Sequence, residues 1–215
     1  MQKQRARSEE EKALRKQSII DALAQLMLQG HSLPSAGDIA KQANITKGVI
    51  YRYFDSREEI FLTLLIQVSA PLNGLASSNY ANLNEFKQQL LDFFNQQPLF
   101  MQLSVQAPVV LEQNISSEFA RSFKLAGADL IDTLASCIHQ FAPELTSFQR
   151  RQFIYTLYQL AQAKWQSAHP PRAIQEAFAD HSHWLVNHDM RQEMSDVFDW
   201  LWYGLRYLTQ QANVE

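Results

Sequence analysis

The chain has 215 residues, 46% of them hydrophobic, with 6 glycines, 7 prolines and one cysteine. A chain of this length can bury a stable hydrophobic core without disulfide bonds. The single thiol of Cys137 cannot form an intrachain disulfide, which excludes a disulfide-rich secreted scaffold. The first residues lack the apolar run of a signal peptide, and no later run has the length of a membrane span. Because hairpin dipeptides are also sparse, we expect a soluble, cytoplasmic, all-α protein that does not enter membranes.

Charge is unevenly distributed along the chain. Residues 1–60 carry 10 Lys and Arg against 8 Asp and Glu, whereas residues 61–215 carry 9 against 14. The excess is steepest at the start, where Lys3, Arg5 and Arg7 precede any acidic residue. A basic front indicates a module that binds a polyanion, and chance variation is the alternative.

Helical periodicity dominates the sequence. A first helix is predicted by apolar residues on one face, namely Ile19, Ile20, Leu23, Leu26 and Met27. Ser8 with Glu11 forms a capping box before this helix, and Gly30 is placed to end it. Three more capping boxes are predicted, at Ser35 with Asp38, at Ser56 with Glu59 and at Thr146 with Gln149.

The rest of the chain also reads as helices. Helices are expected near residues 57–70, 84–96, 99–113, 117–141, 147–168, 173–187 and 190–211, with breaks at Pro71, Pro98, Pro143 and Pro170-Pro171. Pro108 should kink or split the helix that contains it. Asn73-Gly74 is expected in a loop because no alternating strands flank it.

Residues 35–59 predict a helix-turn-helix. A short helix over 37–43 is followed by a tight turn at Asn44-Ile45 and by a second helix that starts at Lys47, with Thr46 as its N-cap. At 100° per residue, Ile50 and Phe54 are about 40° apart and can both face the earlier helices. The opposite arc, with Gly48, Val49, Arg52 and Tyr53, is then free to enter a major groove.

The residue types on this arc suit DNA. Lys47 at a helix N-terminus favours a phosphate or a guanine edge, and Gly48 permits close approach of the backbone. Val49 can contact a thymine methyl group, and the hydroxyls of Tyr51 and Tyr53 can reach phosphates or bases. Arg57 offers a further phosphate contact at the start of the next helix. The alternative is a solvated surface helix in an ordinary bundle.

The run IAKQANITKGVIYRYFDSREEIF resembles the DNA-binding signature of the tetracycline-repressor (TetR) family of transcriptional regulators. The resemblance covers about residues 15–65 and departs mildly at Asn44, where the family more often has glycine; Asn tolerates the left-handed conformation such a turn needs. It implies a three-helix DNA-binding domain over 1–55 and an effector-binding and dimerisation domain over 56–215. The implied DNA-binding residues are Ser35, Thr46, Lys47, Gly48, Val49, Tyr51, Tyr53 and Arg57. Lys3, Arg5 and Arg7 could reach the DNA as an arm, with a disordered tail as the alternative.

Two late helices each carry two apolar stripes, whereas a surface helix of a monomer needs one. In 190–211 one stripe comprises Met194, Val197, Phe198, Leu201, Leu205 and Leu208, and the other comprises Trp200, Tyr203 and Tyr207, with Gly204 between them. In 147–168 one stripe comprises Ile154, Leu157, Tyr158, Ala161 and Trp165, with Phe153 and Leu160 outside it. TetR-like proteins pair two such helices from each subunit in a four-helix dimer interface. The predicted interface residues are Leu157, Leu160, Trp165, Trp200, Tyr203, Gly204 and Tyr207; the alternative is that all this surface is buried within one subunit.

Phenylalanine and methionine are frequent in the middle of the chain. In TetR-like regulators the corresponding helices surround an effector pocket, and these side chains suit an apolar or aromatic ligand. The candidate pocket residues are Phe100, Met101, Phe123, Tyr155 and Tyr158. An ordinary hydrophobic core is the alternative.

No pattern in the sequence indicates catalysis, a metal or a cofactor. His181, His183 and His188, with Asp180 and Asp189, have no compact ligand spacing, and Cys137 reads as a small buried hydrophobe. The resulting hypothesis is a homodimeric, effector-controlled repressor that binds palindromic double-stranded operator DNA, with the helix after Ser56 as the lever between its domains. The rival hypotheses are a small-molecule carrier that has lost DNA binding and an all-helical enzyme with an unrecognised site.

Overall fold

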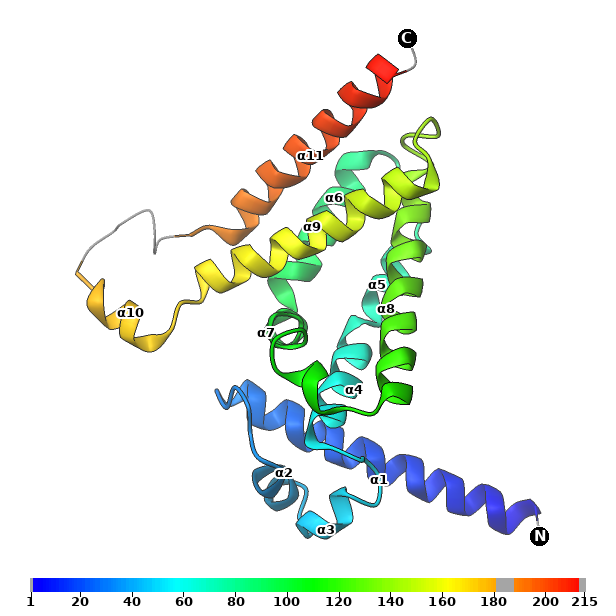
Figure 1. The fold of residues 1–215 in the computed structure, drawn as a ribbon, viewed down its shortest axis with the longest axis vertical. Coiled ribbons are helices and arrows are strands. Elements are labelled where there is room, and N and C mark those ends of the chain that lie inside the picture. The colour runs from blue at the N-terminus through cyan, green and yellow to red at the C-terminus, as the bar shows by residue number, and fades with distance from the viewer. Residues whose placement is uncertain (1, 181–187, 213–215) are drawn as a thin grey trace. The chain divides into compact units, whose positions relative to one another are not determined.

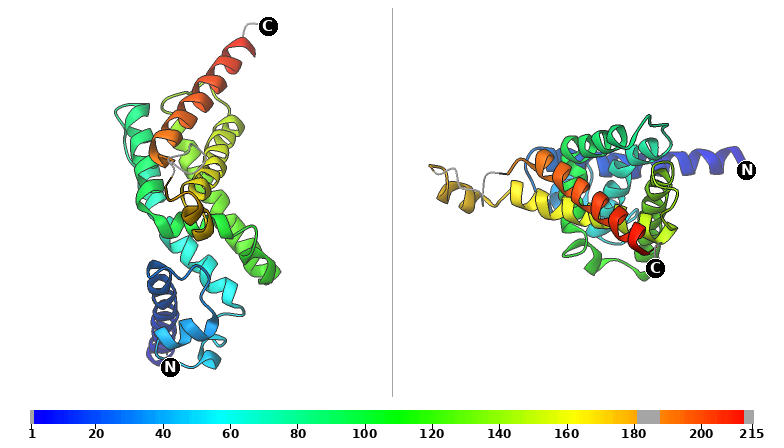
Figure 2. Two further views of the ribbon diagram at one scale, coloured as in Figure 1. Left: turned by 90° about the vertical axis from the view of Figure 1, so that its left-hand side faces the viewer. Right: turned by 90° about the horizontal axis from the view of Figure 1, so that it is seen from above.

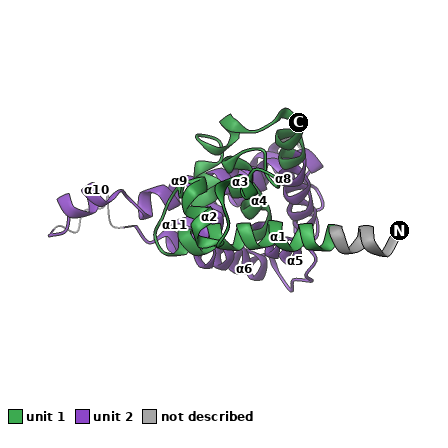
Figure 3. Ribbon diagram, turned by 90° about the horizontal axis from the view of Figure 1, so that it is seen from below, with its two compact units in different colours: residues 1–68, 102–124 green, residues 69–101, 125–215 purple. Residues whose placement is uncertain are grey.

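The structure is a computed structural model that describes residues 2–180 and 188–212, with side chains described for 9–180 and 188–211. No strand occurs in these residues, which confirms the all-α prediction. The chain forms two compact units, one of residues 1–68 and 102–124 and the other of residues 69–101 and 125–215 (Figure 3). We call them unit 1 and unit 2.

Unit 1 contains the predicted helix-turn-helix. Its elements are α1 (Gln2–Leu28), α2 (Ala36–Gln42), α3 (Lys47–Ile50), α4 (Arg57–Ser69), the end of α7 (Pro98–Gln106), the 3₁₀ helix η1 (Leu111–Asn114) and the start of α8 (Ser117–Ile138). α2 packs against both α1 and α3 (Figure 1). Ile19, Leu23, Ile39, Ile50 and Phe61 are fully buried and form the centre of its core. α4 contributes to this core, so unit 1 includes this helix up to Val68; the domains expected over 1–55 and 56–215 stay predictions.

Two helices of unit 1 end in the same backbone motif. At the end of α1, Gly30 N–H donates to Met27 C=O and His31 N–H donates to Leu26 C=O, and Gly30 has a φ of 98°. At the end of α2, Asn44 N–H donates to Lys41 C=O and Ile45 N–H donates to Ala40 C=O, and Asn44 has a φ of 53°. Both are Schellman motifs with a left-handed residue after the helix. The prediction that Asn44 supports the turn in place of glycine is therefore confirmed.

Some helix boundaries differ from the sequence predictions. α1 begins at Gln2, so Ser8 does not cap it, and the positions of Lys3, Arg5 and Arg7 already belong to the helix, although their side chains lie outside the described part. Asn73-Gly74 lies within a short helix, α5 (Pro71–Ala76), that starts with a proline at its first position, where no N–H is needed. The predicted break at Pro108 is confirmed, because α7 ends at Gln106 and η1 follows.

The stretch Arg57–Ala76 has the length and the mean hydropathy, 1.4, of a membrane-crossing helix. It is interrupted between α4 and α5, and Ile60, Phe61 and Leu62 of α4 are fully buried in unit 1. The apolar residues of α4 thus form part of a protein core.

Unit 2 consists of α5, α6 (Leu83–Gln96), the start of α7, the rest of α8, α9 (Ser147–Ala168), α10 (Arg172–Ala177) and α11 (Met190–Ala212). α11 packs along α9 and α6 (Figures 1 and 2). The α9–α11 pair is antiparallel, because Gln149 hydrogen-bonds to Thr209 near one end and Lys164 pairs with Glu193 near the other. Between these contacts, the Phe153 ring meets the Phe198 ring edge-on at 5.1 Å.

A buried lysine joins α6 to α11. The Lys87 ammonium lies 2.8 Å from the Asp199 carboxylate and 5.6 Å from the centre of the Phe198 ring, and its side chain is 8% exposed against 47% for Asp199. Removing the carboxylate leaves an almost buried cation without its partner, whereas removing the cation leaves a carboxylate that water already reaches.

We therefore expect Asp199→Ala to lower the free energy of unfolding by about 1–3 kcal/mol. Lys87→Met, which keeps most of the apolar stem, should cost less than about 1 kcal/mol. Urea unfolding of the two variants measures both values. Equal losses would contradict this asymmetry between the partners.

Candidate DNA-binding site

The inner face of the α3 segment is fixed by burial. Ile50 is fully buried and Phe54 is 4% exposed, which confirms that both side chains face the core. The Ile50 carbonyl accepts hydrogen bonds from the N–H groups of Tyr53 and Phe54, and the Lys16 ammonium of α1 lies 5.4 Å from the centre of the Phe54 ring. The segment after α3 is thus held against α1 although α3 itself has only 4 residues.

The outer face of this segment is open to solvent. Thr46, Lys47, Gly48, Tyr51 and Arg52 are exposed, whereas Val49 and Tyr53 are half-buried. The Lys47 ammonium lies 6.0 Å from the centre of the Tyr51 ring, which holds a cation beside a phenol on the exposed side. Thr46 is the N-cap of α3, but its hydroxyl accepts no hydrogen bond from the first turn, so it is available to a ligand.

Gly48 has no structural reason within unit 1 to be glycine. A Cβ built on it meets nothing within 4 Å, and its φ lies outside the left-handed region. Glycine costs about 1 kcal/mol relative to alanine within a helix. An exposed glycine leaves the backbone open to close approach by an outside partner, which is what the predicted role of Gly48 in DNA binding requires.

We accordingly expect Gly48→Ala to raise the free energy of unfolding by up to about 1 kcal/mol, while it weakens binding to specific DNA. Thermal unfolding and fluorescence anisotropy with a labelled duplex measure the two effects separately. A variant that is more stable and binds DNA as well as the wild type would show that nothing approaches this backbone.

Ser35 works as a helix cap. Its hydroxyl donates to Asp38 Oδ2 at 2.6 Å and accepts from Asp38 N–H at 3.2 Å, while Ser35 N–H donates to the same carboxylate at 2.9 Å. This confirms the capping box at α2. The hydroxyl hydrogen is used within the cap, so Ser35 has none to give to a phosphate. The hydrogen bonds from Ser35, first from its hydroxyl and then from its N–H, hold the pKa of Asp38 below its ordinary value, so the ionised cap persists to a lower pH than a free aspartate would.

Arg57 is partly engaged within the chain. Its Nη2 lies 2.7 Å from Glu58 Oε1, its Nε donates to the same oxygen at 3.1 Å, and its guanidinium lies 5.7 Å from the centre of the Phe61 ring. The next carboxylate, that of Glu59, accepts from Asp55 N–H, and Glu59 N–H donates to the Ser56 hydroxyl. A phosphate contact by Arg57 stays a prediction, and it would have to share the guanidinium with Glu58.

The structure divides the predicted dimer residues into two groups. Trp200, Tyr203 and Tyr207 are 72%, 70% and 60% exposed, and Gly204 between them has nothing within 4 Å of an added Cβ. Leu157, by contrast, is 1% exposed and belongs to the core of unit 2, which corrects its placement on a free face.

The burial of several other residues of the two predicted stripes also differs from what the stripes suggest. Leu160 and Trp165 are half-buried, and the Trp165 ring stacks on His169 at 3.6 Å. Leu208, which shares a predicted stripe with the buried Val197 and Phe198, is 65% exposed, whereas Phe153 and Trp202 are buried and their rings meet at 5.6 Å. The two apolar stripes of α11 alone could not identify Trp202 as the core residue.

The effector candidates are not all brought together. Phe100 meets the Phe93 ring at 4.9 Å and the Tyr158 ring at 6.1 Å in unit 2, and Met101 is fully buried. Tyr155 is 48% exposed. Phe123 belongs to unit 1. Sequence reasoning missed one feature of α7, the fully buried Ser104, whose hydroxyl has no hydrogen-bond partner among the described residues.

The histidine group is only partly described. His181 and His183 lie outside the described residues, while His188 Nδ1 lies 2.7 Å from Glu193 and Asp189 caps α11 by accepting from Gln192 N–H. Within residues 2–180 and 188–212, no three metal-ligating side chains come together.

Family models match almost the whole described chain. The model of the bacterial regulatory proteins of the tetR family matches residues 19–64, and that of the tetracyclin repressor-like C-terminal domain matches residues 64–207. No curated protein sequence is significantly similar to the chain.

Solved structures share the fold. FadR from Bacillus subtilis, in complex with stearoyl-CoA, is 17% identical with a TM-score of 0.56, over 86% of this chain and 96% of its own. The TetR family repressor AlkX from Dietzia sp. strain DQ12-45-1b, implicated in biodegradation of n-alkanes, is 15% identical with a TM-score of 0.53, over 88% and 97%. A tetR-family transcriptional regulator from Streptomyces coelicolor is 18% identical with a TM-score of 0.53, over 94% and 89%.

These matches place the helix-turn-helix of unit 1 and the helices that follow it within one known architecture. The chain belongs to the TetR family and is a transcriptional regulator, not an enzyme.

Proposed function

We propose that the chain is a homodimeric repressor that binds a palindromic operator through α3 and leaves it when a small apolar or aromatic effector binds. The observation that carries the DNA-binding part is the exposed face of the α3 segment. Lys47, Gly48 and Tyr51 are exposed there, while Ile50 and Phe54 are buried and the Phe54 ring lies against Lys16 of α1. Exposed side chains on a helix that is fixed by its buried face are suited to contact base edges in a major groove.

The exposed face of α11 supports the homodimer. Trp200, Tyr203 and Tyr207 are all at least 60% exposed, at spacings that place them on one side of the helix. Tryptophan and tyrosine dominate the energetics of protein interfaces, and such a contiguous patch is unusual on a monomer. A two-fold dimer presents two copies of α3, which implies inverted half-sites about one helical turn of DNA, or a multiple of it, apart.

The aromatic cluster around Phe100 supports the class of effector. Phe93, Phe94, Phe100 and Tyr158, which all belong to unit 2, form ring contacts that suit the apolar body of a ligand. FadR, with the same fold, was solved with stearoyl-CoA. Such an effector changes DNA binding only if it binds the DNA-bound and the DNA-free conformations of the protein with different affinities.

Selection of duplexes from a random pool by the wild-type protein tests the proposed function. We expect enrichment of an inverted repeat, and protection of two half-sites when the protein is bound to it. Long-chain acyl compounds and aromatic compounds are then added to the complex, and those that raise the melting temperature of unit 2 should release the DNA. A selected pool without dyad symmetry would contradict the homodimeric operator. Ligands that stabilise the protein without changing DNA affinity would contradict effector control.

A further inference from the structure

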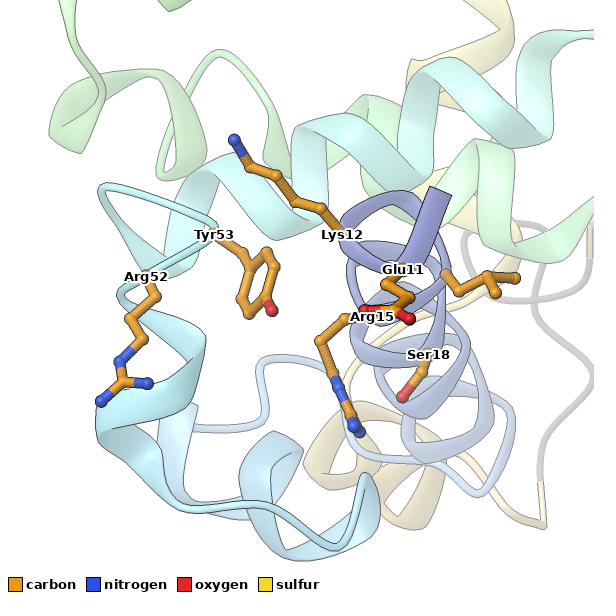
Figure 4. A pocket seen from close by; sticks show the side chains of 7 residues that line it. Glu11, Lys12, Arg15, Ser18, Arg52 and Tyr53 are labelled. Atoms are coloured by element: carbon orange, nitrogen blue, oxygen red, sulfur yellow. The ribbon is translucent and has the colours of Figure 1, made fainter. Parts of the chain in front are cut away.

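A charged groove lies in unit 1 between α1 and the turn that ends α3. Its volume is about 730 Å³. The residues that line it are Glu11, Lys12, Leu14, Arg15 and Ser18 of α1, and Arg52 and Tyr53 after α3 (Figure 4). It therefore joins segments that are far apart in the sequence and close in the fold.

Cations predominate in this groove. Its lining contains three cationic side chains, those of Lys12, Arg15 and Arg52, and one carboxylate, that of Glu11. All three cations are exposed, and none of them forms an ion pair within the part of the chain whose side chains are described. The groove thus keeps its positive charge available to an outside anion.

The arrangement of the side chains suits phosphate. Figure 4 shows the Tyr53 ring between Arg15 and Arg52, whose guanidinium groups point the same way. An arginine guanidinium donates two parallel hydrogen bonds to a phosphate, and a tyrosine hydroxyl adds a third donor. Tyr53 also immediately follows the exposed α3 face, so the groove continues the surface that carries Lys47 and Tyr51.

The openness of the groove favours DNA over a free anion. Glu11, Lys12, Arg15 and Arg52 are all exposed, so a single phosphate there remains in contact with water and gains little from each charge. A polyanion brings several phosphates at once and releases its condensed counterions, which makes the same cations effective.

We infer that Lys12 and Arg15 of α1, with Arg52, clamp the phosphodiester backbone beside the major groove that α3 enters. This inference rests on the proposed DNA binding and adds α1 to the DNA-contacting surface. Phosphate contacts carry no sequence information, so this clamp should strengthen binding to every duplex equally.

The test compares Lys12→Ala/Arg15→Ala with the wild type on the selected operator and on a random duplex, by fluorescence anisotropy at several KCl concentrations. The control is Arg121→Glu, which lowers the net charge by the same amount at an exposed position of unit 1 outside the groove. Circular dichroism and thermal unfolding check that both variants are folded.

We expect the double variant to bind both duplexes more weakly by a similar factor, at least tenfold at low salt, with specificity unchanged. The slope of log affinity against log salt should fall by about 0.9 for each phosphate that the variant no longer neutralises, and more than in the control. The same slope for variant and control would overturn the inference. Exchange of chloride for inorganic phosphate at equal ionic strength should affect wild type and variant alike; selective competition with the wild type would identify a small-anion site instead.

Failure of the proposed operator binding would give a different experimental result from failure of the phosphate clamp. A wild type that binds all duplexes equally contradicts the operator, yet its affinity for the random duplex still reports on Lys12 and Arg15.

Discussion

Replacing Lys47 and Tyr51 together by alanine is expected to weaken operator binding at least a hundredfold. Each specific interaction with a base edge contributes about 1–3 kcal/mol, and in a dimer the substitutions remove these interactions from both half-sites. Both side chains are exposed, and the ammonium lies 6.0 Å from the ring centre, so their removal opens no cavity. The thermal stability should therefore stay close to that of the wild type, whereas the variant should no longer discriminate between the operator and a random duplex.

Anisotropy titration of the two duplexes measures this change, and light scattering checks that the variant is still a dimer. Arg121→Ala, which removes an exposed cation of unit 1 outside the α3 segment, is the control. Normal binding by the double variant would show that the α3 face is not the reading surface. This pattern also differs from that of Lys12→Ala/Arg15→Ala, which should weaken binding to both duplexes equally.

The second large effect is expected at α11. Trp200→Ala/Tyr203→Ala should raise the dissociation constant of the dimer at least a hundredfold, because large aromatic anchors at interfaces are worth about 2 kcal/mol or more each. Both side chains are at least 70% exposed in the chain, so the core formed by Phe153, Phe198 and Trp202 is untouched. Sedimentation velocity over a dilution series measures the dissociation constant.

The consequence for DNA follows from symmetry. A monomer presents one α3, so its operator affinity should fall steeply although the DNA-reading residues are intact. Leu28→Ala, which truncates a side chain that is 66% exposed in unit 1, should change neither assembly nor DNA binding. A Trp200/Tyr203 variant that stays dimeric at nanomolar concentration would place the interface elsewhere. Gly204→Ala offers a milder probe, since an added Cβ meets nothing within the chain but would meet an approaching partner helix.

Much of the helix-turn-helix could be predicted because its signals are local. The Ser35–Asp38 cap lies within four consecutive residues, and the Asn44 turn depends on the backbone of one residue. The burial of Ile50 and Phe54 follows from helical period alone. Another local signal did not predict the structure. Asn73-Gly74, expected in a loop, is helical after Pro71.

By itself, the sequence determined the all-α class, the family and the buried side of the α3 segment, since each depends on periodicity, caps and a contiguous motif. Only the tertiary structure decided which apolar stripe is core and which is free. Leu157 and Trp200 are both apolar residues on helices with two stripes, yet the first is buried and the second is 72% exposed. Only the fold brought Arg15 to Arg52 across one groove. The physical reason is that a helical period tells which residues share a face, whereas burial and charge pairing depend on which other helix covers that face.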